Sequence, residues 1–412
     1  MPEPEGAGRR ELSRRGLLGP EAGWSLAPVA AWLAIEGRTI ADPVALVNAL
    51  MARLDAAGAR VDRLRFVSGT LHPQVLAWGA VWSRAGGAQI LTADHGIERT
   101  ESYAGSPIQI VRQQNRPLRQ RIEAGLAADA YSLYHELRVE GVTDYYAVPM
   151  VFGTGVVNFL ALATNAPGGF SDDDLDRFRA LANLLAPLVE LIERQRMTLG
   201  LLDTFVGPRI SRRILDGQVK RGDGERIDAA FWYSDLRGFT ELSETLPAAD
   251  LLQLLNDYFE ACAAAAAARG GEILQFIGDA ALIVFEIRRA GEERRICEDA
   301  LDAAIDAFNA IAVINHRRRR VGLREIAFGL GLHLGTVTHA NVGSPSRLAF
   351  NVVGPAVNKT ARIQARTKDA GVPLLVSAEF AGHIRRPLRS MGSYDLHGAK
   401  GTHEVFAVPE VS

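Results

Sequence analysis

The stretch Phe231-Trp-Tyr-Ser-Asp235-Leu-Arg-Gly-Phe-Thr240 joins an apolar, strand-like run to a carboxylate and a glycine turn. A carboxylate at the end of a strand is held on a rigid element. The backbone N–H groups of the glycine turn and of the helix start behind it can cradle phosphate oxygens. The stretch therefore predicts a strand, a turn and a helix start that suit a phosphate-bearing ligand.

Two later segments follow the same plan of an apolar run, a glycine and one or two polar residues. They are Ile273-Leu-Gln275-Phe-Ile-Gly-Asp279 and Asn351-Val-Val-Gly-Pro-Ala-Val-Asn358-Lys-Thr-Ala-Arg362. Asp279 follows its glycine between two strand-like runs, a pattern that an ordinary hairpin turn also has. Asn358 and Arg362 lie four residues apart in a predicted helix, so they project from one face, as residues of an ordinary solvated face also do.

Taken together, the three segments supply two carboxylates, an amide and a guanidinium. Mg²⁺ prefers oxygen ligands and is often held by one or two carboxylates together with substrate phosphates. Two such ions can activate an attacking oxygen and stabilise a leaving one, while an arginine meets phosphoryl charge. The set predicts a site for a nucleoside triphosphate with its metal ions.

Composition limits the class of protein further. The 412 residues suggest two or three domains, and the 48% hydrophobic content argues against extensive disorder. With 46 basic and 48 acidic residues the net charge is −2, which gives no electrostatic case for binding nucleic acid or an acidic membrane. Cys262 and Cys297 make no disulfide framework, and no apolar run approaches the ~18 residues of a membrane span. A cytoplasmic protein is expected.

The first 170 residues are predicted to be a flexible lead followed by an α+β domain. Residues 1–22 contain Ser13-Arg14-Arg15, which faintly resembles a twin-arginine export signal, but the sequence that follows favours a disordered basic arm. Within 23–170, Asp42-Pro43 predicts the N-cap and first residue of a helix. Further predicted elements are strands at 64–71, 77–82 and 145–152 and a helix at 117–127.

Residues 171–206 are predicted to form one long helix that Ser171 caps. Apolar residues step by three and four along it, at Phe178, Leu181, Leu185, Leu188, Ile192, Leu199, Leu202 and Val206. This heptad seam predicts a parallel dimer stalk, because it continues past the point where one domain would end. The alternative is an ordinary helix packed on its own domain. Pro187 interrupts the ladder and predicts a kink.

A linker is predicted at 207–222 and a second α/β domain at 223–412. The predicted elements of this domain are a strand at 227–234, helices at 239–245 and 248–269, a hairpin at 271–286, a helix at 291–315, a strand at 325–334 and a helix at 355–369, before the last strands. The basic run His316–Arg320 follows a helix and precedes a strand, so a solvated turn is expected there rather than a nucleic-acid site.

In their order and approximate spacing, the three segments resemble the class III nucleotidyl cyclase catalytic domain, over roughly residues 222–410. The resemblance implies a ferredoxin-like βαββαβ fold. It implies that Asp235, Asp279 and the Leu236 carbonyl bind two Mg²⁺ or Mn²⁺ ions. The groups implied to contact the triphosphate are Gly238, Phe239 and Thr240 around it and Lys400 at the distal phosphates.

The resemblance also assigns Asn358 to the ribose and Arg362 to the phosphoryl transition state. The family's catalytic domains work in pairs, with the metal aspartates from one chain and the asparagine and arginine from the other. One copy of each segment therefore implies a homodimer with two equivalent sites. The first half of the chain resembles the N-terminal region of cyclases from alpha-proteobacteria, including rhizobia, and also a GAF sensor domain. This implies a small-molecule or protein regulator that acts on the N-terminal domain.

Gln275 and Asn351 stand at the positions that specify the base in this family. Adenylate-forming members usually have lysine and aspartate or threonine there, and guanylate-forming members have glutamate and cysteine or serine. An amide can donate or accept, so this pair suits either purine. The expected reaction converts ATP to cyclic AMP and pyrophosphate by attack of the ribose 3′ hydroxyl on the α-phosphate. The alternatives are a guanylate cyclase, a degenerate domain that binds nucleotide without turnover, and an interaction scaffold built on the N-terminal domain.

Overall fold

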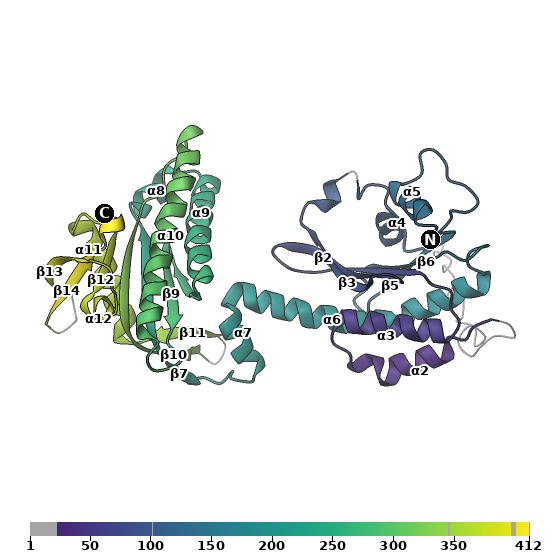
Figure 1. The fold of residues 1–412 in the computed structure, drawn as a ribbon, viewed down its shortest axis with the longest axis horizontal. Coiled ribbons are helices and arrows are strands. Elements are labelled where there is room, and N and C mark those ends of the chain that lie inside the picture. Colours follow the sequence, from purple (N-terminus) through teal and green to yellow (C-terminus); the bar gives the residue numbers. More distant parts are fainter. Residues whose placement is uncertain (1–22, 101, 345–346, 397–400, 412) are drawn as a thin grey trace, which may run out of the picture. The chain divides into compact units, whose positions relative to one another are not determined.

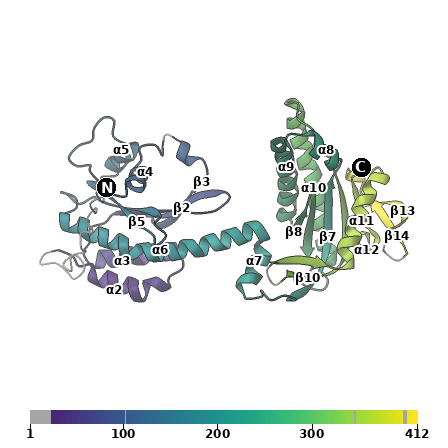
Figure 2. The same cartoon turned by 180° about the vertical axis from the view of Figure 1, so that it is seen from behind.

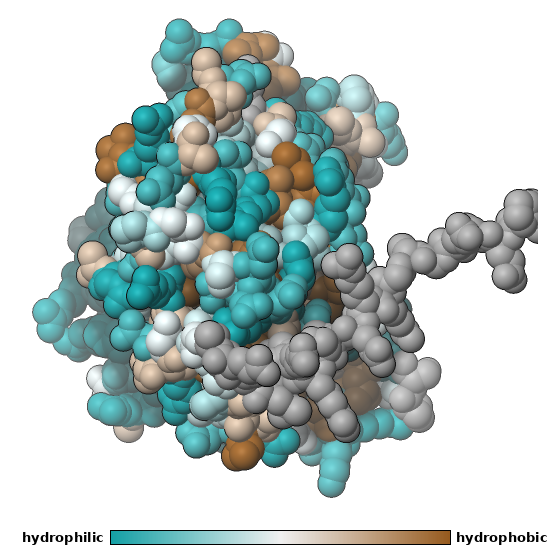
Figure 3. Space-filling model, turned by 90° about the vertical axis from the view of Figure 1, so that its right-hand side faces the viewer, coloured by the Kyte–Doolittle hydropathy of each residue, from teal (hydrophilic) through white to brown (hydrophobic). Residues whose placement is uncertain are grey.

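The computed structural model describes residues 23–100, 102–344, 347–396 and 401–411. The chain is mixed α+β and divides into two compact units, Met1–Val206 and Gly207–Ser412 (Figure 1). Within the described ranges, no helix combines the length and apolar character that crossing a membrane requires. The face drawn in Figure 3 is largely hydrophilic, with its apolar residues in scattered groups, as on ordinary protein surfaces.

The N-terminal unit is built on a six-stranded antiparallel sheet in the order β3-β2-β1-β6-β5-β4. Its strands are β1 (Arg63–Gly69), β2 (Val75–Ser83), β3 (Gly87–Asp94), β4 (Leu118–Arg121), β5 (Asp144–Val151) and β6 (Val157–Thr164). Helices α2 (Ala27–Ile35), α3 (Pro43–Ala56) and α6 (Asp172–Val206) cover one face, and α4 (Pro107–Gln114) and α5 (Ser132–Val139) cover the other (Figure 1). Short 3-10 turns lie at Gly37–Thr39 and Ile97–Arg99.

Two helix starts in this unit follow the capping chemistry that the sequence predicts. The Asp42 carboxylate accepts hydrogen bonds from the backbone N–H groups of Val44 at 3.3 Å and Ala45 at 3.2 Å. Ser171 Oγ accepts from the Asp174 N–H at 3.2 Å, and the Asp174 carboxylate accepts from the Ser171 N–H at 2.9 Å. This reciprocal pair satisfies donors that would otherwise be left free at the start of α6.

The helix predicted at 117–127 is wrong, because this stretch contains the edge strand β4. Its register places Arg119 opposite Tyr146 of β5. The Arg119 guanidinium donates to the fully buried Asp144 carboxylate at 2.7 Å, and the Phe170 N–H donates to the same carboxylate at 3.0 Å. A buried carboxylate needs such donors, and this long-range requirement outweighs the helix-like local pattern.

The first half of the seam on α6 packs inside its own unit. The helix is continuous from Asp172 to Val206 with Pro187 inside it. Phe178, Leu181, Leu185 and Ile192 are buried in the core of their own unit, which is the alternative reading of the heptad pattern. Beyond this core the seam residue Leu199 is 37% exposed, and Leu191 and Phe205, which lie off the seam, are 59% and 76% exposed. Periodicity identified an apolar face but not the partner that covers it.

The C-terminal unit is built on an eight-stranded sheet. Its strands are β7 (Gly224–Leu236), β8 (Glu272–Ile277), β9 (Ala280–Glu286), β10 (Phe328–Ser344), β11 (Arg347–Val353), β12 (Leu374–Ser377), β13 (Arg389–Asp395) and β14 (Thr402–Ala407). Its helices are α7 (Pro208–Leu215), α8 (Phe239–Thr245), α9 (Ala248–Ala268), α10 (Glu293–Arg320), α11 (Pro355–Asp369) and α12 (Ala378–Ala381), with a 3-10 turn at Pro409–Val411. The antiparallel order β10-β7-β9-β8, with helices after β7 and β9, is the βαββαβ arrangement predicted for this unit.

Helices cover both faces of this sheet. Helices α9 and α10 pack on one face around the fully buried Trp232, Tyr258 and Phe285 (Figure 2). Helix α11 packs on β10, where Gly331 permits the close approach. A Cβ at Gly331 would lie 2.6 Å from the Gln364 nitrogen and 2.8 Å from the Thr360 carbonyl oxygen. This contact fixes the position of α11 on the sheet.

The predicted linker at 207–222 contains the helix α7, which is docked on the C-terminal unit. The Arg209 guanidinium pairs with Glu286 at 2.7 Å, and the Arg213 guanidinium lies 3.2 Å from the Glu225 carboxylate. The Arg209 N–H also donates to the Glu272 carboxylate at 3.0 Å. These ion pairs join residues distant in sequence, so the local glycine pattern could not predict them.

The basic run His316–Arg320 is the last turn of α10 rather than the predicted solvated turn. Cations at a helix C-terminus are favoured by the helix dipole. Arg318 is only 6% exposed. Its guanidinium pairs with Asp257 at 2.6 Å and donates to the Arg324 carbonyl at 2.7 Å.

We expect Arg318→Ala to lower the free energy of unfolding by about 2–3 kcal/mol, measured by chemical denaturation. The substitution leaves the Asp257 carboxylate without its partner. The loss lies at the low end for a buried pair because the Asp257 side chain is 23% exposed. Arg319→Ala is the control, since the Arg319 side chain is 62% exposed, and its loss should stay within about 0.5 kcal/mol. Equal losses for the two variants would contradict this account.

Candidate active site

Two aspartates meet at one end of the central strands of the C-terminal unit. Asp235 is the last residue but one of β7 and pairs with Ala280, the first residue of β9. Asp279 occupies the tight turn between β8 and β9, next to Ala280, and Gly278 supplies the left-handed conformation of that turn with φ +63°. The two carboxyl groups lie within hydrogen-bonding reach of each other.

The electrostatics of this pair favour a bound cation. Burial, followed by the hydrogen bond and the charge of Asp279, raises the pKa of Asp235 to about 7. Two neighbouring carboxylates cannot both ionise without a compensating charge. In the ranges that the structure describes, no group of three or more His, Cys, Asp or Glu side chains could form a metal site. Two carboxylates, with the backbone carbonyl of the adjacent Leu236, would suit Mg²⁺ that completes its shell with water and phosphate oxygens.

The segment expected to cradle phosphate follows Asp235 directly. Gly238 has φ +73° and precedes α8, and no atom lies within 4 Å of a Cβ added there. Glycine is thus required by the backbone conformation and not by crowding. Phe239 packs partly buried against the core and anchors the turn, while Thr240 is exposed. Lys400 lies outside the described residues.

Asn358 and Arg362 lie one turn apart on α11. Asn358 is exposed and Arg362 is partly buried. Within the described ranges, neither side chain has a hydrogen bond or an ion pair. By contrast, the Lys359 ammonium pairs with Glu379 at 2.5 Å and the Arg366 guanidinium pairs with Asp369 at 2.9 Å. Arg362 is thus a cation that this stretch of the helix does not neutralise.

The two halves of the predicted site are not bonded to each other within one chain. Helix α11 lies along β10 at Gly331 and Gly335, and no hydrogen bond or ion pair among the described residues joins Asn358 or Arg362 to the aspartate pair.

Gln275 on β8 and Asn351 on β11 are both exposed, and β8 and β11 do not pair with each other in the sheet. The side-chain oxygen of Asn351 accepts a hydrogen bond from the Val352 N–H at 2.8 Å. Gln275 lies at an irregularity in the pairing of β8 with β9.

Sequence reasoning missed residues that support the aspartate pair. The Tyr258 hydroxyl donates to Ser234 Oγ at 2.7 Å and ties β7 to α9 on the face opposite Asp235. Next to Asp279, Phe276 and Ile277 are 49% and 42% exposed although they are apolar. An apolar run on β8 that its own core does not cover could have signalled a contact surface.

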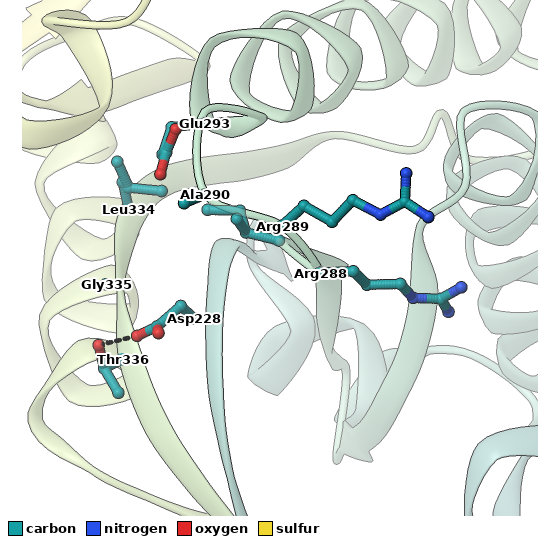
Figure 4. Close-up of a pocket in the computed structure, with 9 residues that line it drawn as sticks. Asp228, Arg288, Arg289, Ala290, Glu293, Leu334, Gly335 and Thr336 are labelled. Atoms are coloured by element: carbon teal, nitrogen blue, oxygen red, sulfur yellow. Dashed lines mark hydrogen bonds between the residues drawn. The ribbon is translucent and has the colours of Figure 1, made fainter.

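A pocket of about 410 Å³ lies away from these residues, at the other end of β7. Asp228, Glu293, Leu334, Gly335 and Thr336 line it (Figure 4). Asp228 is seven residues before Asp235 on one strand, which corresponds to roughly 23 Å. Thr336 Oγ1 donates to the Asp228 carboxylate, and the side chains of Arg288 and Arg289 extend away from it. The pocket therefore takes no part in the candidate site.

Comparison with known families identifies the unit that carries the site. Residues 225–408 match the family model of the adenylate and guanylate cyclase catalytic domain. The C-terminal unit therefore has the class III cyclase catalytic domain. The matched range includes Asp235, Asp279, Asn358 and Arg362, together with Gln275 and Asn351.

Individual relatives of this cyclase domain include curated and solved proteins. The adenylate cyclase of Anabaena cylindrica is 33% identical over 159 residues, which are 38% of this chain and 30% of that protein. Adenylate cyclase 1 of Rhizobium meliloti is 26% identical over 185 residues, which are 44% of this chain and 28% of that protein. The chain thus spans less than a third of either relative.

Among solved structures, the adenylyl cyclase CyaB from P. aeruginosa is similar with a TM-score of 0.41 and 26% identity. The similarity covers 44% of this chain and 94% of that chain. The guanylyl cyclase Cya2 is similar with a TM-score of 0.40 and 28% identity, covering 45% of this chain and 92% of that chain.

Proposed function

We propose that the protein is a purine nucleotidyl cyclase that converts ATP to cyclic AMP and pyrophosphate. The observation that carries the proposal is the Asp235–Asp279 pair, held at the end of β7 inside a segment that matches the cyclase catalytic domain. The raised pKa of Asp235 supports it, because the pair gains most from a divalent cation that arrives with the nucleotide.

Each group of residues has a separate role in the proposed reaction. Asp235, Asp279 and the Leu236 carbonyl would hold two Mg²⁺ or Mn²⁺ ions. Such ions lower the pKa of an attacking hydroxyl and neutralise charge on the leaving pyrophosphate. The turn Gly238–Thr240 would orient the triphosphate through its backbone N–H groups. Arg362 would stabilise the charge that develops on the phosphoryl oxygens, and Asn358 would orient the ribose so that its 3′ oxygen faces the α-phosphate.

We propose that two copies of the chain form each active site. The support is that Asn358 and Arg362 have no partner in the described part of their own chain and are not joined to the aspartate pair. The exposed Phe276 and Ile277 beside Asp279 offer apolar area for a second copy. On α6, the exposed Leu191 and Phe205 offer a second contact surface. They lie fourteen residues, or two heptads, apart, so they fall on the same face of a coiled coil.

The N-terminal unit is proposed to regulate the cyclase as a GAF-like sensor domain. Its sheet carries helices on both faces, and α6 leaves its core after Ile192 to continue to Val206. A ligand or partner that changes this unit would act on the cyclase through α6. The regulator is proposed to be a small molecule or a protein.

The reaction is tested by incubating the full chain with ATP or GTP and Mg²⁺ or Mn²⁺ and separating the products. Formation of a cyclic nucleotide and pyrophosphate in equal amounts supports the proposal. Tight nucleotide binding without any cyclic product would favour the degenerate nucleotide-binding domain instead. Cyclic GMP as the main product would favour the guanylate cyclase.

Gln275 and Asn351 are expected to set the base preference. Gln275→Lys with Asn351→Asp should raise the ratio of ATP to GTP turnover at least about tenfold, because the pair then donates to adenine N1 and accepts from its amino group. Gln275→Glu with Asn351→Ser should shift the ratio the opposite way. Both ratios come from kcat/KM values measured with the two nucleotides in parallel. An unchanged ratio in both double variants would remove these residues from base recognition.

A further inference from the structure

The face of α6 that packs into the core of the N-terminal unit changes from apolar to polar at Glu193. Val189 is a buried core residue, and Glu193, Arg196 and Gly200 continue its stripe at steps of four, three and four. Glu193 is only 6% exposed, although a carboxylate is rarely buried without a cation or several donors. This part of the helix is therefore held on its unit by polar contacts and not by an apolar core.

The hairpin of β1 and β2 supplies the partners of this polar stripe. The Trp78 indole donates a hydrogen bond to one Glu193 carboxylate oxygen, and the Arg196 guanidinium lies 4.7 Å from the centre of the same indole ring. In the loop between the two strands, the His72 ring lies against Gly200, where an added Cβ would be 2.8 Å from its Cδ2 atom. Glycine weakens a helix relative to alanine, and here it makes room for the ring. We call these five residues the α6 latch.

The Glu193 carboxylate is only half satisfied in the α6 latch. Its second oxygen is buried and has no hydrogen-bond partner in the described part of the chain. Burial raises the pKa of Glu193, and the side chains of Thr70 and Trp78 and the charge of Arg196 oppose this effect only in part. The protonated acid therefore fits the buried position better than the carboxylate does.

Other charged and titratable side chains lie around the α6 latch. Arg196 on α6 is the cation whose charge acts on Glu193. From the loops, His72 belongs to the latch itself, and His95 Nε2 donates to the His72 carbonyl at 2.8 Å. Glu190, three residues before Glu193, already has an arginine partner at 2.7 Å. Histidine side chains commonly titrate between pH 5 and 8, so the test must separate them from Glu193.

We propose that the α6 latch is a pH-sensitive contact, which is closed when Glu193 is protonated and opens when Glu193 is ionised. An ionised carboxylate with one bare oxygen regains solvation by leaving the Trp78 indole. Since the closed latch holds the proton more tightly, its stability is lost as the pH rises above the usual value of 4.5 and through the raised pKa. Opening frees residues 193–206, the end of α6 that continues into the C-terminal unit. A regulatory effect on cyclisation rests on the proposed function, whereas the latch itself belongs to the N-terminal unit.

Hydrogen exchange of the full chain tests the latch and requires no cyclase activity. Protection factors, which are corrected for the intrinsic pH dependence of exchange, are measured for the amides of residues 194–206 at pH 5 and pH 8. In the unchanged chain, protection should fall at least about threefold from pH 5 to pH 8, because closing takes up a proton. The amides of α3 in the same unit are the reference and should change less. Equal protection of residues 194–206 at the two pH values would overturn the proposal, whether or not the chain forms a cyclic nucleotide.

Glu193→Gln tests the residue, because the amide keeps the shape of the side chain and cannot ionise. At pH 8 it should protect residues 194–206 at least about threefold better than the unchanged chain does, and its protection should be the same at pH 5. Asp203→Asn is the matched control, since Asp203 is an exposed acid on the same helix, and it should behave like the unchanged chain. If Glu193→Gln keeps the pH dependence, a histidine causes it. If it lowers protection at both pH values, Glu193 has a structural role, and either result overturns the proposal.

Discussion

Asp235→Ala is expected to lower cyclic nucleotide formation by at least about a thousandfold, because it removes a metal ligand from the end of β7. The variant would keep only the Asp279 carboxylate and the Leu236 carbonyl. These are too few ligands to position the metal ions at the α-phosphate. Product is measured from ATP and GTP with Mg²⁺ and with Mn²⁺. Asp228→Ala is the matched control: it changes an aspartate near the other end of the same strand and should keep most of the activity. Activity retained by Asp235→Ala would exclude the metal assignment.

The same carboxylate gives an expected pH dependence of stability without metal. The pKa of Asp235 in the folded chain is about 7, raised by burial and by Asp279. Between pH about 4 and 7 the unfolded chain has released this proton while the folded chain keeps it, so stability falls as pH rises through that window. Asp235→Asn removes this loss. In EDTA its unfolding temperature should exceed that of the unchanged chain at pH 8, and the difference should close by pH 4.

This stability measurement separates a site from a structural carboxylate. If Asp235 served only to hold β7 in place, Asp235→Asn would lower the unfolding temperature at every pH. If it serves to bind a cation, Mg²⁺ should raise the unfolding temperature of the unchanged chain and have a smaller effect on the variant.

The second large effect is expected at Arg362. Arg362→Ala should lower kcat by about a thousandfold with a much smaller change in KM, because the guanidinium contacts charge that is greatest in the transition state. Nucleotide binding, measured by calorimetry with a non-cyclisable ATP analogue, should change little. Arg366→Ala is the control one turn further along α11, where the guanidinium is paired with Asp369. Equal losses of kcat in both variants would point to damage of the helix.

Sequence reasoning predicted the core of the C-terminal unit well, because its signals are local. Helix 355–369 begins at Pro355 after a glycine and coincides with α11, and the hairpin at 271–286 coincides with β8 and β9 around Gly278. Proline at a first helical position and glycine in a tight turn act within a few residues. The same local chemistry placed Asp235 and Asp279 at strand ends.

The errors have a different physical origin, since each depends on a partner far away in the sequence. Strand β4 was predicted as a helix because the local sequence does not show that Arg119 pairs with the buried Asp144, which is distant in the chain. Helix α10 continues through the basic residues 316–320, where a turn was predicted, and Arg318 pairs there with Asp257 on α9. The apolar seam of α6 showed a buried face but could not show that residues such as Leu181 pack on their own unit.

The candidate site was predictable as residues but not as geometry. The motif supplied Asp235, Asp279, Asn358 and Arg362, while only the fold shows that no hydrogen bond or ion pair joins the two pairs within the described part of one chain.

Complementation between two inactive variants tests the central account most directly. Asp235→Ala and Arg362→Ala chains, each with its own tag, are co-expressed, and cyclic nucleotide formation is measured on protein purified through both tags. Every such dimer should have one complete site and one site lacking both residues, so about half of the unchanged dimer's activity is expected. Each variant alone should be inactive. Failure to recover activity, although both tagged chains co-purify and the unchanged chain is active, would contradict a cyclase site shared between two copies.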